Sequence, residues 1–269
     1  GNMVKKIVKG VILAVGLLFI YPPILLLVVF SFTPATTLGV WEGFSFDLYV
    51  QLVGNAQIMN IVKDTVILAV LAAAVSTVLG TLGAIGIFYS KKKTANAVSA
   101  VSRIPVINAE VVTAMSLALL FVALTMYKTY VSLLISHVAI TLPFVVLSVI
   151  PKLKQMDPNL YEAALDLGAT PTKALFKVVL PEILPGVLSG FMLAVTLSLD
   201  DYIVTAFVKP DWFDSISTYV YDSIKVPQQS AVPQLRALSA IIFVLIIVAV
   251  LVMNIPKNKQ KNRFKEKID

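Results

Sequence analysis

Two adjacent aspartates are the residues in this sequence best placed to do chemistry. Asp200 and Asp201 lie in an otherwise apolar run from Gly186 to Val208. A carboxylate at the centre of a bilayer costs about 2.5–3.5 kcal/mol on insertion scales, so acids at such positions usually have a function. Carboxylates there can replace the hydration shell of a cation. Ser198 can add a hydroxyl acceptor, and Tyr202 can offer an aromatic face to an ammonium group.

A third acid, Glu110, lies in a different apolar stretch. Carboxylates on two different helices suit a ligand with two separated positive charges. The interior of the apolar stretches contains no lysine or arginine, which argues against internal salt bridges and against phosphate or sulfate as the ligand. The chain has no cysteine and a single histidine, His137, which makes no metal site and is expected to be a hydrogen-bonded packing residue.

Both acidic positions also have a structural interpretation. Ser198-Leu199-Asp200-Asp201 matches a capping box, so the two aspartates could cap a broken helix near the outer surface. Glu110 could be a hydrogen-bonded residue at an interface with a partner subunit. These alternatives stay open at the level of the sequence.

The elements that position these residues are predicted to be membrane helices. The chain has 269 residues, of which 58% are hydrophobic and 14% charged, whereas a soluble domain has about a quarter charged residues. Because open sheets leave backbone groups unpaired in lipid, an all-α polytopic membrane protein is expected. Six spans are predicted, near 10–32, 62–90, 105–126, 130–150, 186–208 and 237–255. The first is too long for a signal peptide and is expected to be retained in a single transmembrane domain, 1–269.

The distribution of charge predicts the orientation. The basic residues cluster at the amino terminus, in the 90–104 and 151–185 loops and after Pro256. Of the 22 lysines and arginines, only five fall on the other side of the membrane: Lys63, Lys128, Lys209, Lys225 and Arg236. The positive-inside rule therefore places both termini in the cytoplasm and explains the net charge of +7 without a nucleic-acid partner.

Two further features have a packing or interfacial interpretation. The second predicted span carries small residues at four-residue spacing, a pattern that lets helices approach closely: Ala72, Ser76, Gly80 and Ala84. Trp41, with Phe44, Phe46 and Tyr49, could form an aromatic surface at the outer mouth of a substrate pathway. Because aromatic belts are common at membrane interfaces, Trp41 could equally be an interfacial anchor.

The 151–185 loop is too long for a simple connector, and it contains its own helix signals. Asp157-Pro158 is an N-cap followed by proline, a short helix is expected from Leu160 to Leu167, and Gly168 ends it. Thr170-Pro171 repeats the start signal, and a second short helix is expected to end near Val179. The sequence therefore predicts a helix-turn-helix elbow at 157–181.

The elbow resembles the EAA loop of ABC-importer permeases. Glu162-Ala163-Ala164, then three residues, Gly168, nine residues and Val178-Val179-Leu180-Pro181 follow the family pattern EAA-x3-G-x9-I-x-L-P, with valine for isoleucine as the one departure. The resemblance implies the type I importer permease fold and a coupling helix that sits in a cleft of an ATP-hydrolysing subunit. Ala163 and Ala164 would allow close approach, and Glu162 and Asp166 could pair with basic groups there.

Other stretches are similar to polyamine (spermidine/putrescine) importers, in particular to their second permease subunit. These are residues 40–52, 136–146, 161–170 and 197–208, so the resemblance covers nearly the whole chain. It implies a permease in a bacterial cytoplasmic membrane that moves polyamines by alternating access. The implied partners are a second, homologous permease, two copies of an ATP-binding subunit and an extracytoplasmic polyamine-binding protein.

The resemblance implies that this chain is not itself an enzyme. It has no G-x-x-x-x-G-K-[ST] phosphate loop, so no cofactor is expected in this chain, and ATP and magnesium would be used by the partner. The alternatives are a permease for another cationic or small polar solute, or an ion-coupled secondary transporter whose acids carry protons. No internal repeat of the kind found in such carriers is apparent. No motif supports an intramembrane enzyme.

Overall fold

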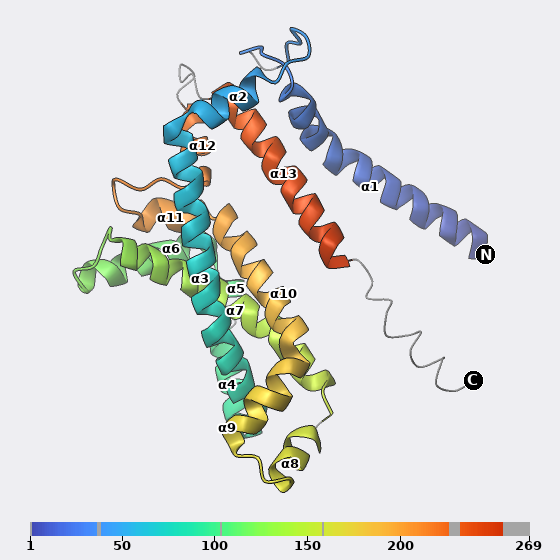
Figure 1. The fold of residues 1–269 in the computed structure, drawn as a ribbon, viewed down its shortest axis with the longest axis vertical. Coiled ribbons are helices and arrows are strands. Elements are labelled where there is room, and N and C mark those ends of the chain that lie inside the picture. Colours follow the sequence, from blue (N-terminus) through green and yellow to red (C-terminus); the bar gives the residue numbers. More distant parts are fainter. Residues whose placement is uncertain (1, 37–38, 103, 158, 226–231, 255–269) are drawn as a thin grey trace. The chain divides into compact units, whose positions relative to one another are not determined.

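The protein is described by a computed structural model that covers residues 2–36, 39–102, 104–157, 159–225 and 232–254 (Figure 1). Every regular secondary-structure element in these residues is a helix, joined to the next by turns or short irregular segments. The contacts group the chain into two compact units. The first unit combines Gly1–Met59 with Ser223–Asp269, and the second unit is Asn60–Asp222.

Apolar helices occupy all six places where spans are predicted: α1 (Asn2–Phe30), α3 (Ala56–Tyr89), α6 (Glu110–Ala123), α7 (Tyr130–Gln155), α10 (Leu180–Asp200) and α13 (Val232–Asn254). Within the described residues, four helical segments are long and apolar enough to cross a bilayer: Gly10–Phe30, Ala56–Tyr89, Tyr130–Gln155 and Pro171–Asp200. Glu110–Ala123 and Pro233–Val248 are shorter apolar helices.

Two of the predicted spans consist of two helices each, and the break in the second was one of the open interpretations of the paired aspartates. The stretch predicted at 105–126 consists of α5 (Ile104–Ile107) and α6, with Ala109 in an extended conformation at ψ 133° between them. The stretch predicted at 186–208 consists of α10 and α11 (Ile203–Val208). The second break falls at Asp201, whose backbone is extended at ψ 121°.

In the first unit, α13 contacts both α1 and α2 (Asp47–Gly54). Arg236, which is only 5% exposed, joins α13 to the end of α1 through backbone carbonyls. Its guanidinium donates to Phe30 O at 3.3 Å and also to Ala35 O. Because neither acceptor is a carboxylate, this buried charge is stabilised by peptide dipoles.

In the second unit, α7 packs closely against two ridges of small residues. On α3, Ala72, Ser76 and Ala84 are fully buried, and a Cβ at Gly80 would lie 2.8 Å from Val145 Cγ1. The packing expected of this ridge is confirmed. A second ridge, on α10, consists of Gly186, Gly190, Ala194 and Ser198.

The ridge on α10 is as close to α7 as the ridge on α3. A Cβ at Gly190 would lie 3.2 Å from the Cα of Val145, so Val145 fits between two glycines on two different helices. The four-residue spacing of small residues on α10 would have predicted this contact from the sequence alone.

Candidate functional site

The first helix of the elbow, α8 (Asn159–Asp166), has the predicted caps. The carboxylate of Asp157 accepts from the backbone N–H of Asn159 at 2.9 Å. At the other end Gly168 has φ +85°, a conformation that glycine adopts readily and that most other residues adopt only with strain. The N–H of Gly168 donates to Leu165 O and that of Ala169 to Ala164 O, at 2.9 and 3.0 Å. These two bonds form a Schellman motif, which confirms the turn.

The second helix of the elbow begins as predicted but does not end at Val179. Thr170 Oγ1 accepts from the N–H of Lys173 at 3.4 Å, with Pro171 in the first turn of α9 (Pro171–Ala174). A π-helical turn, η1 (Leu175–Val179), then leads directly into α10. The elbow is therefore continuous with a membrane helix, and α8 lies at the opposite end of α10 from α11 (Figure 1).

The elbow exposes the side chains that a partner would need to contact. Glu162, Ala163 and Asp166 are exposed, and Ala164 is half-buried. Leu167, just before the glycine turn, is 89% exposed, and Pro181 is exposed at the start of α10. Apolar and acidic groups thus lie together on one short helix and its turn.

Asp201 is a helix cap. It is 4% exposed, and its carboxylate accepts the backbone N–H groups of Val204 at 3.3 Å and Thr205 at 2.8 Å. These bonds satisfy the first amides of α11 and interrupt the ladder of α10, which explains the break in physical terms. The structure therefore has Asp201 capping a helix, although not through the Ser198–Asp201 capping box, because Ser198 Oγ bonds to His137 instead.

Asp200 differs from its neighbour because the helix periodicity places it on another face. The buried face of α10 contains Gly190, Ala194 and Ser198, and Asp201 follows three residues after Ser198. Asp200, two residues after Ser198, falls on the opposite side and is exposed. It stands at the carboxyl end of α10, where the helix dipole is negative and favours a cation.

Glu110 is brought close to these aspartates by the two broken spans. It lies in the first turn of α6, is exposed, and its carboxyl interacts with that of Asp201 and, more weakly, with that of Asp200. The beginning of α6 therefore meets the junction of α10 and α11. Carboxylates this close repel one another, and a bound cation would relieve that repulsion.

A cleft of about 190 Å³ lies beside Glu110. Its polar lining comprises Glu110, Asn108 and Thr113, and the Asn108 amide donates to Thr113 Oγ1 at 3.2 Å. The remaining lining is apolar: Val106, Ile140, Phe144 and Leu197. One carboxylate beside an apolar wall matches an ammonium group on a methylene chain.

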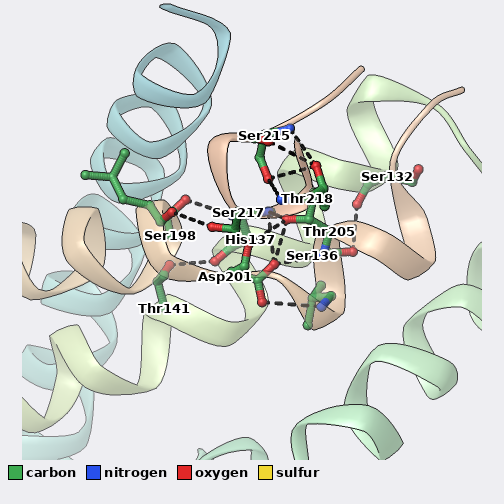
Figure 2. A network of polar contacts seen from close by, with 12 residues as sticks. Ser132, Ser136, His137, Thr141, Ser198, Asp201, Thr205, Ser215, Ser217 and Thr218 are labelled. Atoms are coloured by element: carbon green, nitrogen blue, oxygen red, sulfur yellow. Dashed lines mark hydrogen bonds and ion pairs between the residues drawn. The ribbon is translucent and has the colours of Figure 1, made fainter. Parts of the chain in front are cut away.

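His137 is the centre of a buried polar network around the break in α10 and α11 (Figure 2). Its ring contacts Ser198 Oγ at 2.7 Å and Thr205 Oγ1 at 3.0 Å. Its Nε2 also lies 3.7 Å from Asp201 Oδ2. The expectation that His137 is a hydrogen-bonded packing residue is confirmed. Sequence reasoning missed Thr205, which no motif distinguishes from other span threonines.

The aromatic candidates lie in different units. Tyr202 pairs with Tyr221 in the second unit, with ring centroids 4.3 Å apart. Trp41, half exposed, makes an edge contact with Phe30 in the first unit. Phe44, Phe46 and Tyr49 surround Phe32 there, so the expected aromatic group is centred on a residue that sequence reasoning had not included.

Comparison with known proteins identifies the family. Residues 1–258 match the family described as "Binding-protein-dependent transport system inner membrane component". The chain belongs to this family. It is therefore a multi-pass membrane permease of the ABC-importer class, and the family resemblance of the elbow is confirmed.

Curated members of the family match over most of their length. The chain is 32% identical over 250 residues, 93% of each chain, to the spermidine/putrescine transport system permease protein PotC of Escherichia coli (strain K12). It is 32% identical over 239 residues, 86% of this chain and 84% of the relative, to the putrescine transport system permease protein PotI of the same strain.

The permease fold is supported by a solved structure. A chain of the bacterial alginate ABC transporter, in complex with an alginate pentasaccharide-bound periplasmic protein, matches with a TM-score of 0.65 and 20% identity. The match covers 94% of this chain and 92% of that chain. The chain therefore shares its overall helical fold with a chain of a solved ABC transporter.

Proposed function

We propose that this chain is one permease subunit of an ATP-driven importer that moves polyamines into the cell. The observation that carries the proposal is the 32% identity, over 93% of the chain, to a spermidine/putrescine permease. The aligned stretch of 250 residues is long enough to include both the elbow and the acidic residues, so the similarity is not limited to one motif.

The acidic residues are proposed to have two different roles, direct contact with the cation and support of the helix break. Asp200 and Glu110 are the exposed carboxylates near the helix breaks and are proposed to contact ammonium groups directly. Asp201 and Ser198 are buried, so they act by holding the break that presents Asp200. The apolar wall formed by Ile140, Phe144 and Leu197 would accompany the methylene chain. Tyr202 and Trp41 remain candidates for aromatic contacts with the substrate.

The energy is proposed to come from a separate subunit that binds ATP and magnesium, because the sequence has no phosphate loop. Two copies of that subunit would clamp the elbows of this permease and of a second, homologous permease. Glu162 and Asp166 would pair with basic groups in the ATPase cleft, while Ala163 and Ala164 allow close approach. Gly168 and Pro181 shape the turn and the entry into α10.

An extracytoplasmic binding protein is proposed to deliver the polyamine. The alginate transporter that shares this fold is seen in complex with a periplasmic protein, which supports such an arrangement. In alternating access, ATP binding closes the ATPase dimer, the elbows move, and the pathway opens outward; hydrolysis resets it inward. The distribution of basic residues supports cytoplasmic termini in a bacterial cytoplasmic membrane.

Reconstitution tests this proposal. The assembled permeases and ATPases, in liposomes with the binding protein, should take up labelled spermidine or putrescine only when ATP is present. Uptake by this chain alone without nucleotide would instead favour a secondary transporter. ATP-dependent uptake of another solute, without uptake of spermidine or putrescine, would support an ATP-driven importer but would show that polyamines are not its substrate.

A further inference from the structure

His137 bonds to both sides of a broken helix. Its Nδ1 lies 2.7 Å from Ser198 Oγ in the last turn of α10, and its Nε2 lies 3.0 Å from Thr205 Oγ1 in α11. The ring is 0% exposed, and it belongs to a third helix, α7. Figure 2 shows Ser198, Asp201 and Thr205 gathered around it. The imidazole thus links the end of α10 to α11, two segments that are not joined by a continuous helix.

The hydrogen bonds around the ring define the position of its proton. Both carboxyl oxygens of Asp201 accept backbone amides, and at 2.6 Å the hydroxyl of Thr205 also donates to Oδ2. With its one proton used, Thr205 Oγ1 must accept from His137 Nε2–H. In the neutral ring Nδ1 is then an acceptor, and it receives the hydroxyl proton of Ser198. The donations therefore run from Ser198 to His137, from His137 to Thr205 and from Thr205 to Asp201.

We propose that His137, as the neutral ring with its proton on Nε2, is a positioning residue that sets the α10–α11 break and thereby the place of Asp200. This rests on the proposed function, in which Asp200 contacts the substrate. His137 itself, fully buried, does not touch the cation.

The break explains why a contact between α10 and α11 is needed. At the end of α10 the backbone loses the carbonyl-to-amide bonds of a continuous helix, which is costly in an apolar environment. Asp201 satisfies amides at the start of α11, and Ser217 Oγ donates to Leu199 O at 3.2 Å. Only His137 bonds through its side chain to both helices in the network drawn in Figure 2. Without it the two segments can shift relative to each other, and Asp200 shifts with the end of α10.

The ring proton can be tested directly, because His137 is the only histidine of the chain. The importer is labelled with ¹⁵N-histidine and studied by solid-state NMR in lipid, and the signals of His137 are assigned by their loss in His137→Gln. Protonated Nε2 and unprotonated Nδ1 at neutral pH are expected. A ring protonated on Nδ1, or on both nitrogens, would overturn the inference.

Transport by variants tests the positioning role. His137→Phe fills a similar volume but makes neither bond, and uptake per assembled complex should fall about tenfold, as for the loss of one to two buried hydrogen bonds. The fall should appear in Vmax, with an unchanged half-saturating concentration of loaded binding protein. His137→Gln, whose amide can donate to Thr205 in place of Nε2, should recover most of the rate.

The matched control is Ser136→Ala. Ser136 is fully buried on the same helix, but its hydroxyl bonds to Ser132 O of that helix. Its uptake per assembled complex should match wild type. Equal uptake in His137→Phe and Ser136→Ala, or no recovery in His137→Gln, would reject the positioning role. Failure of wild-type polyamine uptake would reject the proposed function, while the NMR result would still decide the position of the proton.

Discussion

Asp201 is 4% exposed and caps α11, whereas its neighbour Asp200 is exposed at the end of α10. Two identical side chains, adjacent in sequence, therefore have different environments and different expected roles. The consequence is that their substitutions should fail in different ways.

We expect Asp200→Asn to abolish or strongly reduce polyamine uptake while the complex assembles and melts as wild type does. Asp201→Ala should instead lower stability by about 0.5–2 kcal/mol, the cost of a lost helix cap. Uptake and thermal unfolding of the assembled complex measure the two effects. Asp201→Asn is the milder control, because its single amide oxygen can still accept from one of the two backbone amides, that of Thr205. Wild-type uptake in Asp200→Asn would remove Asp200 from the pathway.

The turn of the elbow makes a second prediction. Gly168 has φ +85°, where a β-branched residue is strained by roughly 1–2 kcal/mol. Gly168→Val should therefore displace α8 and uncouple ATP hydrolysis from uptake, whereas Gly168→Asn, which tolerates this conformation, should retain coupling. The assay is stimulation of ATPase activity by the loaded binding protein. Equal stimulation in both variants would contradict a role for the turn geometry.

Close packing in the second unit predicts that two substitutions, one at Gly80 and one at Val145, compensate each other in stability. In Gly80→Ala the new Cβ would meet Val145 Cγ1 at 2.8 Å, and overpacking of this kind costs about 1–3 kcal/mol. Val145→Ala in the same chain removes Cγ1 and should relieve part of the clash, although Cβ of residue 145 stays 2.9 Å from the new Cβ, so the double variant should be more stable than the sum of the single changes predicts. Thermal unfolding measures the coupling. Gly83→Ala, with no atom within 4 Å of the new Cβ, should have little effect.

A surface ion pair predicts a weak dependence of stability on pH. Lys128 Nζ lies 2.6 Å from Asp211 Oδ1; their hydrogen bond and mutual attraction raise the pKa of Lys128 and lower the pKa of Asp211. The stabilisation from Asp211 is present above its ordinary pKa and is lost as pH falls through the lowered value. That from Lys128 is present below its ordinary pKa and is lost as pH rises through the raised value.

Because both side chains are exposed, the effect should be small and screened by salt. The difference in melting temperature between wild type and Asp211→Asn should be largest at neutral pH and low salt. It should disappear in acid and at high salt. A difference that persists at high salt would contradict a simple surface pair.

Local signals in the sequence were sufficient for the elbow. The caps at Asp157, Gly168 and Thr170 form hydrogen bonds between residues two to five positions apart. The spacing of these residues along the chain is therefore enough to predict where the elbow helices begin and turn. Spans could be located for the same reason, since a run of apolar residues is a local property. The continuation of the second elbow helix into α10 was missed, because the next predicted span was taken to begin only at residue 186.

The sequence by itself determined the helical class, the six apolar segments, the elbow and the presence of acids where a bilayer disfavours them. Only the tertiary structure decided where two spans break and which aspartate is exposed. The cap that Asp201 places on α11 is local, but His137, 61 residues before Ser198 in sequence, contacts Ser198 and Thr205 on the two sides of the break. This contact exists only because α7 packs against α10 and α11, and no pattern within a single segment contains that partner.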